Sequence, residues 1–134
     1  MNRTSRHFNR RRCLTALLLT GAACGSNNAG TGPIELTVDL DVELSREQEL
    51  LTVYRNQFRP AISKQPGFLD VKLLRFVSTV SGAAPVNMNY RLLISFQTEE
   101  QRRAWVNTPL HRQVWPNMEK TLRGGYSAVL FEVV

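Results

Sequence analysis

The feature that most constrains the fold is an alternating segment that leads directly into a capped helix. In residues 87–97 the apolar side chains recur at every second position, which predicts a strand with one buried face. Residues 98–101, Thr-Glu-Glu-Gln, then form a capping box with acidic side chains at the positive end of a helix. Thr108 and Pro109 restart this helix, with threonine as the cap and proline in the first turn.

A similar strand and helix stand upstream. Residues 34–44 alternate strictly between apolar and polar side chains, which predicts another half-buried strand. Ser45 and Gln48 predict a second capping box, and apolar residues then recur at three- and four-residue spacing, as on one face of a helix. Pro60 predicts that this helix kinks or ends near residues 58–59, because proline has no backbone N–H to donate.

Two further strands complete the set. Residues 69–80 predict a strand, and residues 81–85 predict the hairpin loop that follows it. Residues 123–125, Arg-Gly-Gly, are expected to stop the second helix, and residues 126–134 predict a closing strand. The order strand, helix, strand, strand, helix, strand predicts an α+β fold with both helices on one face of an antiparallel sheet.

The sheet face without helices is expected to bind a partner. In the last three predicted strands, apolar residues occur at odd and at even positions, so both faces of the sheet carry apolar side chains. The face without helices is therefore expected to carry an exposed apolar patch. A second copy of the chain across a two-fold axis would cover it, and we therefore expect a homodimer.

The net charge of +6 belongs to the N-terminus. Five of the seventeen basic residues lie in residues 1–12, and no acidic residue precedes Glu35. The remainder holds twelve basic and eleven acidic residues. We therefore expect no nucleic-acid partner, because such binding requires a basic patch on the folded domain.

Residues 1–24 have the parts of an export signal: a basic head, a short apolar run and small residues before a cleavage site. Arg10-Arg11-Arg12 resembles a twin-arginine pattern. Residues 22–25, Ala-Ala-Cys-Gly, resemble a lipoprotein box that would place a lipid on Cys24, and cleavage without lipidation stays the alternative. We expect a protein in the periplasm or on the outer cell surface, tethered to the membrane if Cys24 is lipidated.

Residues 25–33 are small, polar or helix-breaking and predict a flexible linker, which leaves residues 34–134 as the folded domain. The domain contains no cysteine, so it has neither a disulfide nor a thiol nucleophile. Its sequence shows no zinc-ligand spacing and no phosphate-binding glycine loop, and we expect no metal site.

Three segments of the domain carry a family resemblance: residues 65–69 (QPGFL), residues 93–100 with Trp105, and residues 109–112 (PLHR). In order and spacing they resemble the antibiotic biosynthesis monooxygenase domain, over about residues 34–134. The resemblance implies a ferredoxin-like βαββαβ fold that pairs into a dimeric α+β barrel. It also implies either cofactor-independent oxygenation of quinols and anthrones or haem degradation.

The spacing after Trp105 disfavours haem. Haem-degrading members of the family carry a histidine ligand ten residues after this tryptophan, and that position is Trp115 in this chain. His111 follows Trp105 by only six residues, and Pro109 interrupts the helix between them. We therefore expect no cofactor, with haem binding as a weaker alternative.

The same residues allow a pocket for a small aromatic substrate. His111 is the candidate base, because its ordinary pKa of about 6.5 suits proton transfer near neutrality. Asn89 or Arg75 is the candidate group that stabilises the resulting oxyanion. Candidate walls for a flat phenolic ring are aromatic residues: Trp105, Tyr90, Phe96 and Tyr54.

Structural explanations stand beside these roles: His111 as a surface histidine, and Trp105, Trp115 and Tyr54 as packing residues. The sequence thus predicts an exported monooxygenase that oxidises a quinol or another phenolic aromatic without a cofactor. The alternative is a non-enzymatic, small-molecule-binding or stress-related dimeric module on the same fold.

Overall fold

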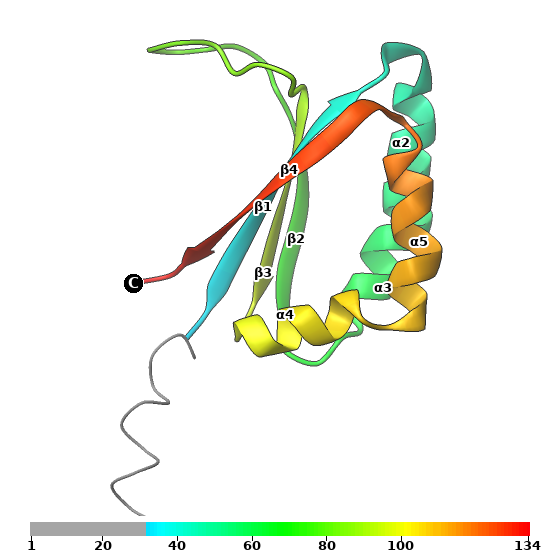
Figure 1. Cartoon of the computed structure of the whole chain (residues 1–134), viewed down its shortest axis with the longest axis vertical. Coiled ribbons are helices and arrows are strands. Elements are labelled where there is room, and N and C mark those ends of the chain that lie inside the picture. The colour runs from blue at the N-terminus through cyan, green and yellow to red at the C-terminus, as the bar shows by residue number, and fades with distance from the viewer. Residues whose placement is uncertain (1–31) are drawn as a thin grey trace, which may run out of the picture. The chain divides into compact units, whose positions relative to one another are not determined.

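The computed structural model describes residues 32–134 (Figure 1). The predicted export signal with Cys24, and the linker up to residue 31, lie outside the described residues. Within residues 32–134, no helix is long and apolar enough to cross a membrane.

A four-stranded sheet forms one layer of the domain. Its strands are β1 (Ile34–Val42), β2 (Phe68–Arg75), β3 (Tyr90–Phe96) and β4 (Leu122–Glu132). Their order across the sheet is β2-β3-β1-β4, and each neighbouring pair is antiparallel. This is the ferredoxin-like α+β arrangement, so the predicted fold class is confirmed.

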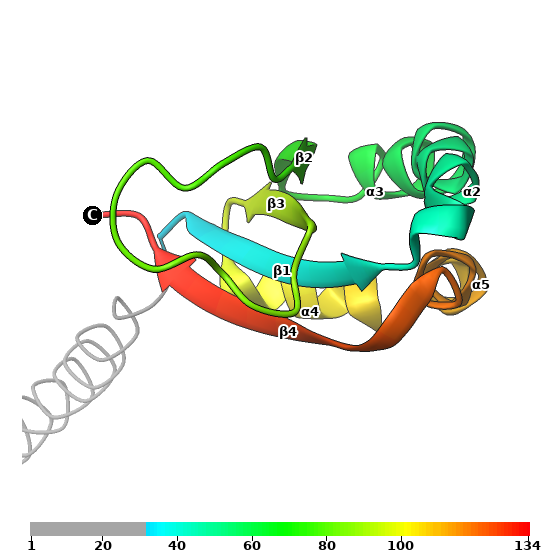
Figure 2. The same cartoon turned by 90° about the horizontal axis from the view of Figure 1, so that it is seen from above.

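The helices form the second layer and lie on one side of the sheet (Figures 1 and 2). They are η1 (Leu44–Arg46), α2 (Glu47–Val53), the π-helical turn η2 (Tyr54–Phe58), α3 (Arg59–Ser63), α4 (Glu99–Val106) and α5 (Pro109–Glu119).

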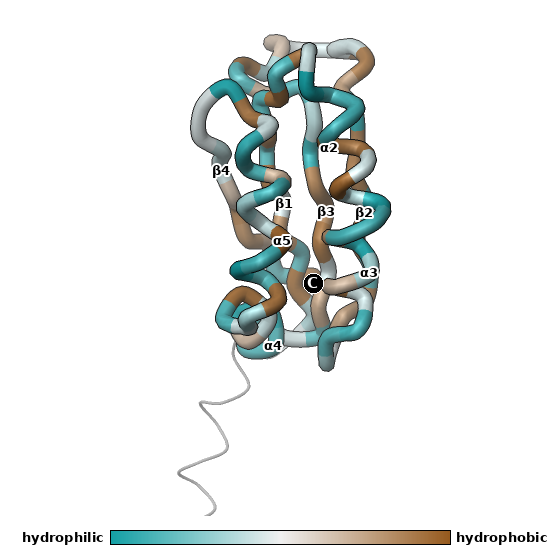
Figure 3. Tube along the Cα trace, turned by 90° about the vertical axis from the view of Figure 1, so that its right-hand side faces the viewer, coloured by the Kyte–Doolittle hydropathy of each residue, from teal (hydrophilic) through white to brown (hydrophobic). Residues whose placement is uncertain are grey.

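The core lies between the two layers. Alternate residues of β1 and β3 face the helices, and Leu40 and Leu92 among them are fully buried. Leu50 and Ile62 meet them from the first helical segment and are fully buried too. Figure 3, seen from the helix side, shows β3 as largely hydrophobic at the centre of the sheet.

The first helical segment differs from the prediction at both ends. Ser45 makes no capping hydrogen bond, because the chain enters through the 3-10 turn η1 and Arg46 occupies the N-cap of α2. Of the two outcomes predicted near Pro60, a kink or an end, the end does not occur, because the helix continues to Ser63. The wider turn η2 precedes Pro60, and there the N–H of Arg59 bonds to Tyr54 O, so the helix continues past a residue without a donor.

The strand and helix bounds also differ downstream. The second strand ends at Arg75 rather than residue 80, and the second helix ends at Glu119. Arg123-Gly124-Gly125 does not stop the helix but lies inside β4, which starts at Leu122. Pairing outweighs the local glycine signal there, because Leu122 pairs with Val42 and Arg123 forms an ion pair with Asp41.

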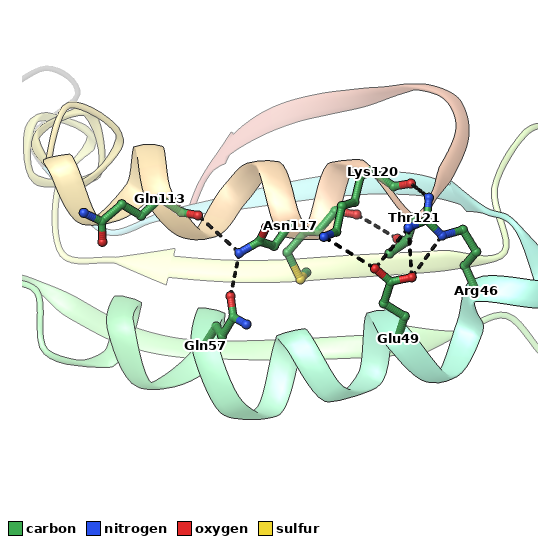
Figure 4. Close-up of polar contacts among 8 residues, drawn as sticks. Arg46, Glu49, Gln57, Gln113, Asn117, Lys120 and Thr121 are labelled. Atoms are coloured by element: carbon green, nitrogen blue, oxygen red, sulfur yellow. Dashed lines mark hydrogen bonds and ion pairs between the residues drawn. The ribbon is translucent and has the colours of Figure 1, made fainter.

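Polar contacts hold α5 beside the first helical segment (Figure 4). The Asn117 side chain donates to Gln57 Oε1 at 2.8 Å. Near the end of α5, Lys120 lies 3.7 Å from the carboxylate of Glu49, and Arg46 also pairs with that carboxylate at 2.9 Å. These contacts fix the position of α5 and of the side chains that it turns toward the sheet.

Candidate functional site

A cavity of about 180 Å³ lies between the sheet and the helices. Strands β1, β3 and β4 form its floor, and α4 and α5 form its wall. Its lining is mostly apolar and aromatic: Leu36, Val38, Phe58, Ile94, Arg102, Trp105, Val106, His111, Trp115, Tyr126 and Ala128.

Five of these residues form an aromatic cluster, which we define as Phe58, Trp105, His111, Trp115 and Tyr126. The His111 ring lies 5.0 Å from the Trp105 ring, edge to face, and 6.2 Å from the Trp115 ring, nearly parallel to it. Tyr126 meets Trp115 edge to face at 5.1 Å. Aromatic pairs favour these geometries, so the rings hold one another in place around the cavity.

The break between α4 and α5 places His111. The side chain of Thr108 accepts the backbone N–H of His111 at 3.1 Å and donates to Trp105 O at 2.7 Å. Thr108 is thus the cap of α5, with Pro109 in the first turn, as predicted. Trp115 follows His111 by four residues, about one helical turn, and therefore lies on the same face of α5.

The surroundings of His111 disfavour its charged form. Burial lowers the pKa of its imidazole below the ordinary value of 6.5, and the positive charges of Arg102 and Arg112 lower it further. No hydrogen bond joins the His111 ring to any other group in residues 32–134. A neutral imidazole on a cavity wall, with no protein partner for its nitrogens, is available to accept a proton from a ligand.

Arg102 brings a positive charge to the same cavity. Glu99 binds its guanidinium through two hydrogen bonds of 2.7 Å, and both side chains are mostly buried. The hydrogen bonds that Arg102 donates to Glu99 raise the pKa of Arg102, so the guanidinium stays charged. Two-point contact with a carboxylate also fixes its orientation.

Asn89, Arg75 and Tyr90 lie apart from this cavity, although the sequence analysis placed them with His111. Tyr90 is buried, and its hydroxyl donates to Glu47 Oε2 at 2.5 Å and accepts from Arg75 Nε at 2.9 Å. We call Glu47, Arg75 and Tyr90 the polar latch, because they tie α2 to β2 and β3. The buried Tyr90 hydroxyl is satisfied by its two partners, while the Arg75 side chain itself is largely exposed. None of the three residues lines the cavity.

Asn89 has a comparable structural task. Its side-chain oxygen accepts the N–H of Val42 at 2.8 Å, and its amide donates to Val42 O at 2.9 Å. It thereby replaces strand pairing next to the register shift between Leu40 and Val42. With its oxygen and amide both engaged there, Asn89 does not face His111.

Phe96 and Tyr54 also fall in the core rather than on the cavity wall. Phe96 is fully buried and packs edge to face against Phe68 at 6.0 Å. Tyr54 is buried and its hydroxyl donates to Val71 O. Of the seven predicted site residues in the described chain, His111 and Trp105 line the cavity.

The cavity also contains residues that the sequence analysis gave no substrate role: Phe58, Arg102, Trp115 and Tyr126. Two of them carried a usable signal. Arg102 precedes Trp105 by three residues, and Trp115 follows His111 by four, and both spacings place side chains on one helix face. Within residues 32–134, no group of three or more histidine, cysteine or acidic residues could hold a metal ion.

No protein-family model and no curated protein sequence matches the chain. Solved structures do match it. A candidate antibiotic biosynthesis monooxygenase from Caulobacter crescentus superposes with a TM-score of 0.65 at 18% identity, covering 81% of this chain and 96% of that one.

A variant of SnoaB, a cofactor-independent oxygenase from Streptomyces nogalater, gives a TM-score of 0.62 at 14% identity over 76% of this chain and 93% of that one. A dimeric ferredoxin-like protein of unknown function from Thermobifida fusca gives 0.58 at 17% identity, covering 76% and 92%. These similarities show that the chain shares the fold of these proteins.

Proposed function

We propose that this chain is a monooxygenase of the antibiotic biosynthesis type, which oxidises a quinol or another phenolic aromatic without a cofactor. One observation carries the proposal: a neutral His111 stands in an aromatic cavity, between two tryptophan rings and with no protein hydrogen bond to its own ring. The fold shared with SnoaB supports the same reaction class.

The cavity suits a flat and mainly apolar ligand. An apolar cavity of about 150 Å³ accepts a benzene ring in other proteins. The present cavity of about 180 Å³ therefore has room for an aromatic ring. Trp105 and Trp115 offer ring faces and edges, whereas the polar groups are restricted to His111 and Arg102, which would orient a phenolic oxygen.

In the proposed reaction, His111 accepts the proton of a phenolic hydroxyl and leaves an electron-rich phenolate. The phenolate reduces dioxygen, and a C–O bond forms at a ring carbon to give a peroxide. The O–O bond then breaks. One oxygen stays on the ring as a carbonyl, and the other leaves as water with the hydrogen of that carbon and the proton held by His111.

The substrate supplies all the electrons in this scheme. A quinol and dioxygen give a hydroxylated quinone and one water, so atoms and electrons balance without an external reductant. Arg102 stabilises the phenolate, because its fixed positive charge lies on the same cavity wall as His111. It takes the role that the sequence analysis gave to Asn89 or Arg75.

The proposal also includes the oligomeric state of the chain and its location. The chain forms a homodimer, as the name of the Thermobifida fusca protein states for that neighbour. It is also exported by the signal in residues 1–24 and anchored through Cys24, on the sequence pattern alone. Replacing Cys24→Ala in the full chain should release it from the membrane fraction, and unchanged membrane association would contradict the anchor.

Oxygen uptake tests the reaction. The full chain is incubated with a panel of benzoquinols, naphthoquinols and anthrones under ¹⁸O₂, and the products are analysed by mass spectrometry. We expect uptake with at least one substrate and one ¹⁸O atom in its product. Binding of these compounds without uptake would contradict the proposal and favour a non-enzymatic binding module.

A further inference from the structure

The loop between β2 and β3, residues 76–89, is the least supported segment of the described domain. Hydrogen bonds at its root hold the loop to the sheet: Phe76 N–H donates to Asn89 O at 2.9 Å, and Asn89 N–H donates to Leu40 O at 2.9 Å. No hydrogen bond joins residues 77–88 to any other residue in 32–134. In both views the loop projects away from the helices, on the open side of the sheet (Figures 1 and 2).

Besides Phe76 at its root, the loop has three large apolar side chains that are almost fully exposed. Val77, Val80 and Val86 are 87%, 97% and 79% exposed. Leaving each valine in water forgoes the favourable transfer of its apolar surface, a term of order 1.5 kcal/mol when burial is complete. Three such residues on one projecting loop indicate a surface that a partner covers.

The open sheet face beside the loop exposes apolar side chains at its two edges. At one edge, Val129 and Phe131 of β4 point away from the helices and are about half exposed. At the other edge, Leu74 of β2 and Phe76 at the start of the loop are also exposed, and the mainly polar side chains of β1 and β3 lie between the two edges. A hollow of about 250 Å³ lies at the loop root, lined by Leu74, Arg75, Phe76, Val77, Met88 and Arg91.

The charges on this face favour a second copy as the occupant. The acidic side chains Asp39, Asp41 and Asp70 form ion pairs with Arg91, Arg123 and Lys72 of the same face. A face of one charge sign would repel its own copy, whereas a face whose charges are paired internally does not.

The position of the loop explains how it would join a dimer contact. A stable interface buries about 800 Å² of accessible surface on each partner. The loop projects on the open side of the sheet, so a second copy seated on that face would meet the loop as well as the strands (Figures 1 and 2).

We propose that residues 76–89 form a dimerisation arm, whose exposed valines pack on the open sheet face of a second copy. The two-fold relation makes the contact reciprocal, so each copy both extends an arm and receives one. This inference rests on the homodimer proposed above and adds the surface that forms it. It is independent of the oxygenation chemistry, which takes place on the other side of the sheet.

Sedimentation velocity over a range of concentrations tests the arm in the full chain. The arm variant carries Val77→Ser, Val80→Ser and Val86→Ser, and its matched control carries Leu44→Ser, an apolar residue 67% exposed in η1. We expect a wild-type dimer, an increase of about 30-fold in the dimer Kd of the arm variant, and no change in the control. Circular dichroism verifies that each variant is folded.

The other outcomes are separable. A dimer whose Kd is unchanged in the arm variant would overturn the arm and leave the homodimer standing, and Phe131→Asp would then test the sheet face alone. A wild-type chain that is monomeric at every concentration would overturn both. If that monomer bound phosphatidylglycerol vesicles through the same valines, the arm would contact a lipid surface instead. Failure of oxygen uptake would affect none of these results.

Discussion

The aromatic cavity and the polar latch contain similar kinds of residues but have different functions. Each places aromatic and charged side chains between a helix and the sheet. In the latch, the Tyr90 hydroxyl is satisfied by Glu47 and Arg75 at hydrogen-bond distances. In the cavity, the His111 ring has no such partner and its pKa is lowered. The difference separates a group that stabilises the fold from a group that is free to act on a ligand.

The largest effect should come from removing the base. His111→Ala should lower kcat/KM by about 100- to 10,000-fold, because general-base catalysis contributes that much. Oxygen uptake at saturating and limiting substrate gives the value, and Gln113→Ala on the exposed side of the same helix is the control. Activity preserved in His111→Ala would remove the functional distinction between the two regions.

Replacing the structural residue Asn89 should lower stability and leave activity unchanged. Asn89→Ala leaves the backbone N–H and C=O of Val42 without their partners and should lower the free energy of unfolding by about 2 kcal/mol. Urea denaturation measures this loss, and kcat should stay near the wild-type value. A large fall in kcat at unchanged stability would move Asn89 into the reaction.

A smaller effect is expected within the polar latch. Tyr90→Phe removes the hydroxyl shared by Glu47 and Arg75 and should cost about 1 kcal/mol of stability. The ring stays in the core, so oxygen uptake should be unchanged. If uptake fell at least as far as in His111→Ala, the latch and not the cavity would contain the reactive groups.

The smallest effect concerns pH. The neutral form of His111 is the base, so activity should fall as pH drops through its pKa, which lies below the ordinary value. Arg112 contributes to this lowering by its positive charge, so Arg112→Gln should raise the pKa and move the acid limb to higher pH. The plateau at higher pH should be unchanged, and a limb that stays in place would exclude His111 as the titrating group.

The sequence predicted the fold well and the site only in part, for physical reasons. Alternation in residues 34–44 and 87–97 specifies which side chains of β1 and β3 are buried, and the caps at Thr98 and Thr108 specify where α4 and α5 begin. Thr98 accepts the N–H of Gln101, which is one half of the predicted capping box. The return contact does not form, because Gln101 Oε1 has no hydrogen-bond partner in residues 32–134. These signals depend only on residues close together in the sequence, so they can be recognised without knowledge of the tertiary structure.

The composition of the site depends on register, which is not local. Tyr90 pairs with Leu40 near one end of the sheet, whereas the cavity floor is formed around Ile94, which pairs with Leu36. Both residues lie on the same face of β3, and their spacing alone could not separate latch from cavity. At Pro60 the sequence predicted a kink or an end of the helix, and only the end is wrong: a π-helical turn precedes Pro60 and the helix continues beyond it.

One binding measurement tests the distinction between cavity and latch most directly. Trp105 and Trp115 are the only tryptophans of the chain, and both line the cavity. Titration of the ¹⁵N-labelled full chain with 1-naphthol under anaerobic conditions reports on them through their indole N–H signals in NMR. The account predicts that both indole signals and the His111 ring shift together, while the backbone signals of Arg75 and Tyr90 do not. Shifts confined to Arg75 and Tyr90, or no shift at all, would contradict it.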